Sequence, residues 1–367
     1  MPNVQETVLE IDLNALKHNF EYLKSKLNAT TKILAVVKAF GYGTNANEIA
    51  NYLEKLNVDY FAVAYTKEGV ALRDAGIKTP ILILHPQPVN FETIIERCLE
   101  PSLYNVRVLT HFLALAKKKK QDNYPIHLKF NTGLNRLGFC ENDINIIIEK
   151  LLETPQVKVK SIFSHLAASE DIDEKEFTLQ QIQSFKRIAK EFKSKIGYAI
   201  MLHQLNTSGM LNYPEAEFDM VRVGIGLYGF GNSNTETKKL QNVASLKSII
   251  SQIHYIEKGE SVGYNKAFIA NHPSKTATIP IGHADGIHRA FGNGNGYVTI
   301  HGKKALIIGN VCMDMLMVNI TDINCNEGDE VIIFDTQETV NDLASSINSI
   351  SYEILTAISQ RVKRIVK

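Results

Sequence analysis

The sequence has no tryptophan and no excess of either charge, since 40 Lys and Arg are balanced by 39 Asp and Glu in 367 residues. A formal charge of +1 lacks the positive potential with which proteins bind nucleic acids or anionic membranes. We therefore expect neither as a partner. The balance instead favours a small, neutral or zwitterionic ligand.

Cysteines and long apolar runs are also scarce. The cysteines contain no CxxC pair, which excludes the usual spacing of zinc sites and of disulfide frameworks; they are Cys98, Cys140, Cys312 and Cys325. No apolar run approaches the ~18 residues that cross a bilayer, and the N-terminal segment lacks the basic and apolar regions of a secretory signal. We therefore expect a cytoplasmic protein with reduced thiols and no metal site.

The sequence does have a hydrophobic content of 44%, spread evenly enough to bury a large core. At roughly 100 to 200 residues per domain, its length predicts two domains. Buried-strand patterns alternate with helical patterns in the first part of the chain. The candidate strands are KILAVVKA (32–39), YFAVA (60–64), ILILH (81–85), SLYN (102–105), IHLKF (126–130), SIFSH (161–165), AIMLH (199–203) and DMVRV (219–223).

Eight strand–helix steps are the number that closes a (β/α)8 barrel of the TIM type, with an open doubly wound sheet as the alternative. After about residue 235 the segments become β-rich and are separated by Gly, Asn and Asp. The sequence therefore predicts a barrel domain over 1–235 and an all-β domain over 236–367. The segment 8–13 (VLEIDL) precedes the first barrel unit and could pair with the β domain.

In such a barrel, chemistry takes place where the strands end. Lys38 follows an apolar run, and burial would make its neutral amine available as a nucleophile, although a lysine at a strand end can also simply extend to solvent. Gly224 and Gly226 follow the eighth strand, where barrels recurrently bind phosphate, and Thr207 adds a hydroxyl. Together these residues suggest a phosphorylated aldehyde cofactor, held by an imine at one end and by its phosphate at the other.

The sequence closely resembles the alanine racemases, and the resemblance extends over essentially the whole chain. The matching segments are EIDLNALKHN, AVVKAFGYG, KFNTGLNRLG, HLAASE, HQLNTSG, VRVGIGLYG, SVGYN, IPIGHADGIHR, GNVCMDM and ISQRVKR. Each is a weak pattern alone, but their order and spacing are specific. The resemblance implies a barrel followed by a β domain, with pyridoxal 5′-phosphate as the cofactor.

The resemblance also implies two catalytic residues. Lys38 would bind the cofactor as an aldimine and handle the proton of the D-enantiomer, while Tyr264, supplied by a second subunit, would handle that of the L-enantiomer. Inversion of a carbon centre needs proton removal on one face and delivery on the other, so two groups are required. Without the resemblance, Tyr264 would be only an aromatic residue near a turn.

The remaining site residues are assigned by the same resemblance. Arg222 would face the pyridine nitrogen with His165 beside it, and Arg136 and the backbone of Met313 would hold the substrate carboxylate. Lys129 matches a lysine that is often carbamylated in the family. The phosphate-binding positions are Tyr42, Thr207, Gly224 and Ile225.

Four positions depart from the family pattern, namely Asn131, His283, Asn310 and Gln360. The first three replace an aspartate, a tyrosine and an arginine, and the last replaces a tyrosine near the C-terminus. We expect these four replacements to alter the range of substrates and the affinity for the cofactor rather than the reaction itself, because Lys38 and Tyr264 are both present.

The resemblance therefore implies a cytoplasmic homodimer that interconverts L- and D-alanine and supplies D-alanine for peptidoglycan. A racemase of another amino acid, such as serine or lysine, is the alternative, and a barrel-type decarboxylase is a further one. Deuterium exchange at Cα without release of CO2 separates racemisation from decarboxylation. A cofactor-binding protein built on the barrel alone would not need residues 236–367.

Overall fold

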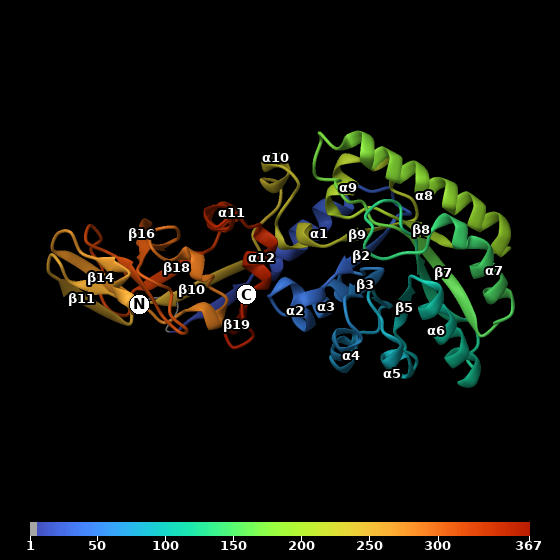
Figure 1. Cartoon of the computed structure of the whole chain (residues 1–367), viewed down its shortest axis with the longest axis horizontal. Coiled ribbons are helices and arrows are strands. Elements are labelled where there is room, and N and C mark those ends of the chain that lie inside the picture. Colours follow the sequence, from blue (N-terminus) through green and yellow to red (C-terminus); the bar gives the residue numbers. More distant parts are fainter. Residues whose placement is uncertain (1–5) are drawn as a thin grey trace. The chain divides into compact units, whose positions relative to one another are not determined.

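The computed structural model describes residues 6–367 and divides into two compact units (Figure 1). The barrel unit comprises Lys17–Gly41 and Ala46–Leu240. The β unit comprises the N-terminal segment that ends at Leu16, together with Tyr42–Asn45 and Gln241–Lys367. The N-terminal segment therefore belongs to the same compact unit as the C-terminal third of the chain.

The barrel unit is built on an eight-stranded parallel sheet with the order β9-β2-β3-β4-β5-β6-β7-β8. Backbone hydrogen bonds bring its two end strands together, because the N–H of Asp219 donates to Leu202 O and that of Arg222 to Leu205 O, both at 3.0 Å. The closed form confirms the predicted barrel over the open sheet. The strands are β2 (Lys32–Val36), β3 (Tyr60–Val63), β4 (Ile81–Ile83), β5 (Glu100–Leu103), β6 (Tyr124–Lys129), β7 (Val157–Phe163), β8 (Met201–His203) and β9 (Met220–Val223).

Helices alternate with these strands along the chain, and α3 to α8 lie around the parallel sheet (Figure 1). Helix α6 shows why they form: the side chain of Asn105 accepts a hydrogen bond from the N–H of Val108 at 2.8 Å, and the face that includes Phe112 and Ala116 is buried. The helices are α1 (Leu13–Lys24), α2 (Lys38–Tyr42), α3 (Ala46–Lys55), α4 (Thr66–Asp74), α5 (Phe91–Glu96), α6 (Val106–Lys118), α7 (Ile144–Leu152), α8 (Lys175–Ile196), α9 (Thr207–Asn212) and α10 (Asn234–Thr237).

The β unit contains a nine-stranded sheet with the order β11-β14-β17-β16-β15-β18-β10-β1-β19, and β12 and β13 form a separate pair. Strand β1 (Val8–Ile11) pairs antiparallel with β10 and parallel with β19, so it ties the two ends of the chain together. The other strands are β10 (Ala244–Ile249), β11 (Gln252–Ile256), β12 (Ser261–Val262), β13 (Phe268–Ile269), β14 (Ser274–Ile279), β15 (Tyr297–Ile300), β16 (Lys303–Ile308), β17 (Leu316–Asn319), β18 (Glu330–Phe334) and β19 (Lys363–Val366).

Two helices make this unit mostly β rather than all β. They are α11 (Gln337–Ser346) and α12 (Ser351–Thr356), and the β-rich pattern of this part of the sequence does not predict α11. The side chain of Thr336 caps α11 by accepting a hydrogen bond from the N–H of Thr339, and the helix buries only a short apolar face. A stripe this short gives little periodicity in the sequence. Within residues 6–367, none of the helices is both long enough and apolar enough to span a bilayer.

Candidate active site

Lys38 begins a short turn of left-handed helix. Strand β2 ends two residues before it, and the φ angles of Ala39, Phe40 and Gly41 are 53°, 57° and 64°. The left-handed conformation costs a non-glycine residue roughly 1–2 kcal/mol, and such strain is retained where a site needs an exact backbone path. The carboxylate of Glu68 helps to hold the turn by accepting a hydrogen bond from the N–H of Ala39 at 2.6 Å. Sequence patterns did not single out Glu68.

The barrel unit gathers the predicted cationic residues into one cluster. Lys38, Lys129, Arg136 and Arg222 lie close enough to influence one another's charge. Desolvation, followed by the nearby positive charges, lowers the pKa of Lys129 from 10.5 to about 8. The same two causes, in the same order, lower the pKa of Lys38, with Arg136 as the charge involved. Both amines are therefore easier to deprotonate than an ordinary lysine.

The half-buried His165 belongs to the same cluster. Burial, and then the surrounding positive charges led by that of Arg222, hold the pKa of this imidazole well below 6.5. It is therefore neutral at physiological pH. No ion pair within residues 6–367 joins Lys38, Lys129, Arg136 or Arg222 to a carboxylate. The nearest carboxylate to act on the group is that of Glu68, which raises the pKa of Lys38 without forming an ion pair with it. A group of cations in which none is ion-paired is suited to binding an anionic ligand.

Arg222 is 5% exposed, and its guanidinium is held by four acceptors. It donates to Ser164 O at 2.7 Å and Gln204 O at 2.8 Å, and to the Nδ1 atoms of His203 at 2.8 Å and His165 at 3.0 Å. Burial lowers the pKa of Arg222 to about 9, so it keeps its positive charge at neutral pH. The arrangement fixes one cation at the ends of the barrel strands.

A close-packed segment follows β9. The N–H of Gly224 donates to the hydroxyl of Thr207 at 3.2 Å, and Ile225 begins a short 3-10 turn. A Cβ atom on Gly226 would lie only 2.6 Å from Cγ2 of Thr207. Glycine is therefore required for the turn to approach Thr207 this closely. The result is a small group of hydroxyl and backbone donors where phosphate binding was predicted.

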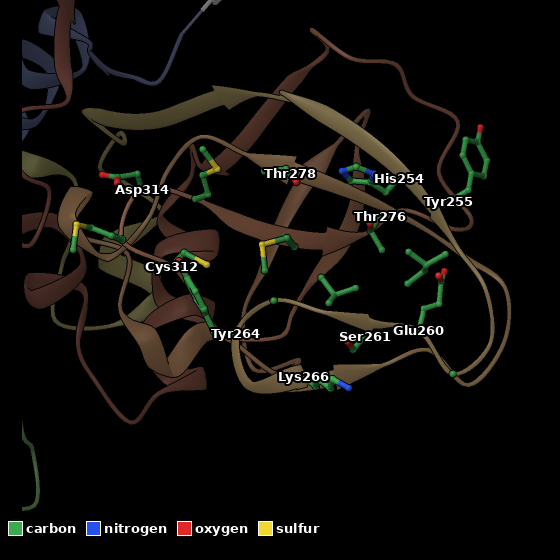
Figure 2. A pocket seen from close by; sticks show the side chains of 17 residues that line it. His254, Tyr255, Glu260, Ser261, Tyr264, Lys266, Thr276, Thr278, Cys312 and Asp314 are labelled. Atoms are coloured by element: carbon green, nitrogen blue, oxygen red, sulfur yellow. The ribbon is translucent and has the colours of Figure 1, made fainter.

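The other predicted residues belong to the β unit. Tyr42 is buried beside Tyr352, with ring centroids 6.1 Å apart, and burial raises the pKa of Tyr42, so it remains a neutral hydroxyl. Tyr264 and Met313 are instead 71% and 59% exposed. Both line an open hollow of about 1140 Å³ whose wall also includes Cys312 (Figure 2). The structure therefore divides the predicted site residues between its two units.

Two of the departures from the family pattern have a structural explanation. Oδ1 of Asn131 accepts hydrogen bonds from the N–H groups of Gly133 and Asn135, so the amide oxygen fulfils the turn-forming role open to an aspartate. Nδ2 of Asn310 donates to Tyr264 O at 3.1 Å and so supports the backbone of the predicted catalytic tyrosine. The side chains of the other two, His283 and Gln360, are exposed.

These features define a class of protein, in which a parallel (β/α)8 barrel with a cationic mouth precedes a mostly β unit. The family model described as the N-terminal domain of alanine racemase matches residues 11–231, and that of the C-terminal domain matches residues 243–366. The chain therefore belongs to the alanine racemase family. This confirms the resemblance drawn from the motifs and the expectation of an isomerase.

Individual relatives match over nearly their full length. "Alanine racemase 1" of Caldanaerobacter subterraneus subsp. tengcongensis is 34% identical over 373 residues, which cover 99% of this chain and 95% of that protein. Among solved structures, the alanine racemase of Clostridium difficile 630 is 32% identical, with a TM-score of 0.93, and covers 100% of this chain and 97% of that one. The alanine racemase of Bartonella henselae, solved with covalently bound pyridoxal phosphate, is 29% identical with a TM-score of 0.89 over 99% of each chain.

Proposed function

We propose that this protein is an alanine racemase that uses pyridoxal 5′-phosphate. The observation that carries the proposal is the group of four cations, Lys38, Lys129, Arg136 and Arg222, that no carboxylate pairs with in the described part of the chain. These residues fit a cofactor that brings a phosphate and a substrate that brings a carboxylate. The covalently bound cofactor of the Bartonella henselae relative supports the same choice. When bound, pyridoxal phosphate draws electrons from the α-carbon of an amino acid and so makes its α-proton easier to remove.

The cofactor would be held at three places. Lys38 would bind its aldehyde carbon, for which the lowered pKa of this amine is suited. Tyr42, Thr207, Gly224 and Ile225 would bind its phosphate, since they offer hydroxyl and backbone donors. The absence of a side chain on Gly226 allows the turn after β9 to pack against Thr207, which brings the backbone donors of the turn close to that hydroxyl.

Arg222 and His165 would hold the pyridine edge. A guanidinium on that nitrogen disfavours its protonation and limits how long negative charge persists on the substrate carbon. Because Arg222 is fixed by four acceptors, it would face the ring without reorganisation. Racemisation would then compete well against side reactions.

The substrate carboxylate would be held by Arg136 and by the backbone of Met313. Lys38 would hold or return the α-proton on the face of D-alanine, and Tyr264 would do so on the face of L-alanine. A positive charge beside Tyr264 would favour the form of the side chain that accepts a proton, and Arg136 would supply that charge. A carbamate on Lys129 would in turn neutralise and position Arg136.

We further propose a cytoplasmic homodimer in which each active site takes Lys38 from one subunit and Tyr264 from the other, and which supplies D-alanine for peptidoglycan. The exposure of large apolar side chains in the β unit supports an interface there, because such residues are usually covered. They include Tyr255, Tyr264, Ile269, Met313 and Met315.

A subunit-mixing experiment tests the shared site. Lys38→Ala and Tyr264→Phe proteins are each assayed for racemisation of L-alanine in the presence of added pyridoxal phosphate, and are then mixed and allowed to exchange subunits. Half of the dimers become mixed, and one of their two sites contains both native residues, so activity should return to about a quarter of wild type. If both residues act within one chain, mixing restores nothing.

The single variants test the individual roles. Lys38→Ala should lose both activity and the absorbance of the covalently bound cofactor. Tyr264→Phe should keep that absorbance and chiefly slow proton removal from L-alanine. Equal slowing in both directions would contradict the assignment of Tyr264 to one enantiomer.

A further inference from the structure

A continuous chain of hydrogen-bonded side chains crosses the interior of the barrel unit from Arg222. NH1 of Arg222 lies 2.8 Å from Nδ1 of His203, whose Nε2 lies 2.9 Å from Oγ of Ser161. That hydroxyl lies 2.6 Å from Nδ1 of His127, whose Nε2 lies 2.6 Å from Oε2 of Glu100. All five residues are buried. Glu100 is the first residue of its strand, so the chain ends at the barrel face opposite the one where Lys38 emerges.

The position of every proton in the first half of this chain follows from Arg222. A guanidinium only donates hydrogen bonds, so Nδ1 of His203 must accept. Burial, followed by the charge of Arg222, holds the pKa of His203 well below 6.5, and a neutral imidazole carries one proton. That proton is therefore on Nε2, and His203 donates it to Ser161.

The second half follows from Ser161. The oxygen of Ser161 accepts a hydrogen bond from Nε2 of His203. The hydroxyl proton of Ser161 is then donated to Nδ1 of His127, because the described residues offer this proton no other acceptor. His127 then carries its proton on Nε2 and donates it to Glu100. If His127 were an imidazolium, two donors would meet at the oxygen of Ser161 and its hydroxyl proton would be left unpaired in a fully buried position, which is costly.

All four hydrogen bonds therefore point in one direction, from a buried cation to a carboxylate that does not touch it. Hydrogen bonds aligned in series polarise one another, so the carboxylate of Glu100 makes Nδ1 of His203 a stronger acceptor for Arg222. This matters because Arg222 has no ion-pair partner of its own among residues 6–367. The series of hydrogen bonds therefore offsets the buried charge of Arg222, although the carboxylate of Glu100 lies at the opposite end of the barrel from the cofactor site.

We propose that Glu100, His127 and Ser161 are positioning residues. Through Ser161 they accept the hydrogen bond from Nε2 of His203, which keeps Nδ1 of that ring turned to Arg222 and so holds the guanidinium toward the barrel mouth. The proposal goes beyond the proposed function but rests on it for the role of Arg222. A substitution that breaks this series of hydrogen bonds far from the cofactor should then change how often the cofactor is lost to transamination.

The serines beside His127 provide a matched pair of variants. In the sheet, Ser102 and Ser161 stand on either side of His127, in register with it. Both are fully buried, but the hydroxyl of Ser102 has no hydrogen-bond partner among the described atoms. Ser161→Ala breaks the chain, whereas Ser102→Ala removes the same atom from the same layer of the barrel and leaves the chain intact.

The first readout is the tautomer of each histidine, measured by long-range proton–nitrogen NMR on protein labelled at its histidine nitrogens. In wild type and Ser102→Ala, His127 and His203 should each carry one proton, on Nε2. In Ser161→Ala the Nε2 proton of His203 has lost its acceptor, so the chemical shift that marks its hydrogen bond should disappear. A proton on Nδ1 of either ring in wild type, or an imidazolium at His127, would overturn the proposal. Cofactor-free protein suffices, so this result is independent of racemase activity.

The second readout is the number of cofactor molecules lost to transamination per racemisation turnover. Ser161→Ala and Glu100→Met should raise this ratio by about tenfold, the effect of one lost hydrogen bond. Glu100→Gln retains an oxygen acceptor for His127 but loses the carboxylate charge, so it should raise the ratio less than Glu100→Met does. An unchanged ratio in Ser161→Ala would overturn the proposal, provided that wild type racemises alanine; failure of wild type to do so would instead contradict the proposed function.

Discussion

The lowered pKa of Lys129 leads to a quantitative prediction about stability. This side chain is 8% exposed, and desolvation followed by three neighbouring cations takes its pKa from 10.5 to about 8. Between these two values the unfolded chain binds more protons than the folded one, so stability rises with pH. The charged form costs the native state about 3 kcal/mol below pH 8, and the cost disappears above pH 10.5.

Replacement of this charge should therefore stabilise the protein at low pH only. Lys129→Gln should raise the free energy of unfolding at pH 7 by up to about 3 kcal/mol and should have little effect near pH 10.5. Urea denaturation of cofactor-free protein, prepared without dissolved CO2, measures this difference. Lys160→Gln on β7 is the matched control, because Lys160 is exposed. Equal stabilisation by Lys129→Gln at both pH values would refute the reasoning.

The same pKa bears on carbamylation of Lys129. At pH 7 about a tenth of the amine is neutral, roughly 300 times the fraction of an ordinary lysine. The neutral amine can attack CO2, forming a carbon–nitrogen bond and releasing a proton, which leaves an anionic carbamate among the cations. Added bicarbonate should therefore stabilise wild type, and labelled bicarbonate should give a carbamate signal by NMR. Neither effect should occur in Lys129→Gln, and absence of both from wild type would contradict the predicted modification.

Two further substitutions test the walls of the site. The carboxylate of Glu68 accepts hydrogen bonds from three backbone N–H groups, including that of Ala39. In Glu68→Gln an amide N–H group would face at least one of these donors. We therefore expect the free energy of unfolding, measured with urea, to fall by about 1–2 kcal/mol, and we expect kcat to fall as well. Gly226→Ala puts a methyl group 2.6 Å from a carbon of Thr207, so affinity for pyridoxal phosphate, measured by fluorescence titration, should weaken by about tenfold. An unchanged affinity would contradict the close-packed phosphate segment.

The eight barrel strands were predictable because each is a short apolar run between helical patterns. Strand β5 (Glu100–Leu103) begins two residues before its predicted segment, since its first two residues, Glu100 and Pro101, are not typical of strands. Helix α11 was missed because its apolar face is short. In each case tertiary packing, rather than local pattern, set the outcome.

The site was predictable to the extent that its motifs lie at strand ends. Lys38, Lys129 and Arg222 could be placed at one end of a barrel by counting strands. Glu68 could not, because it acts through the backbone of a left-handed turn that the sequence does not reveal. The alternation in IHLKF does put His127 and Lys129 on one face of β6, which is the one clue to a polar interior that sequence reasoning left unused.

The sequence by itself determined the family, the barrel and the residue types available for chemistry, because these depend on local patterns and on the order of motifs. Only the tertiary structure decided which charges remain without partners and which buried hydrogen bonds connect. Burial and neighbouring charge set the protonation of Lys129 and His165, and the direction of the hydrogen-bond series from Arg222 to Glu100 depends on contacts among five strands. Both are properties of groups that meet only when the chain folds.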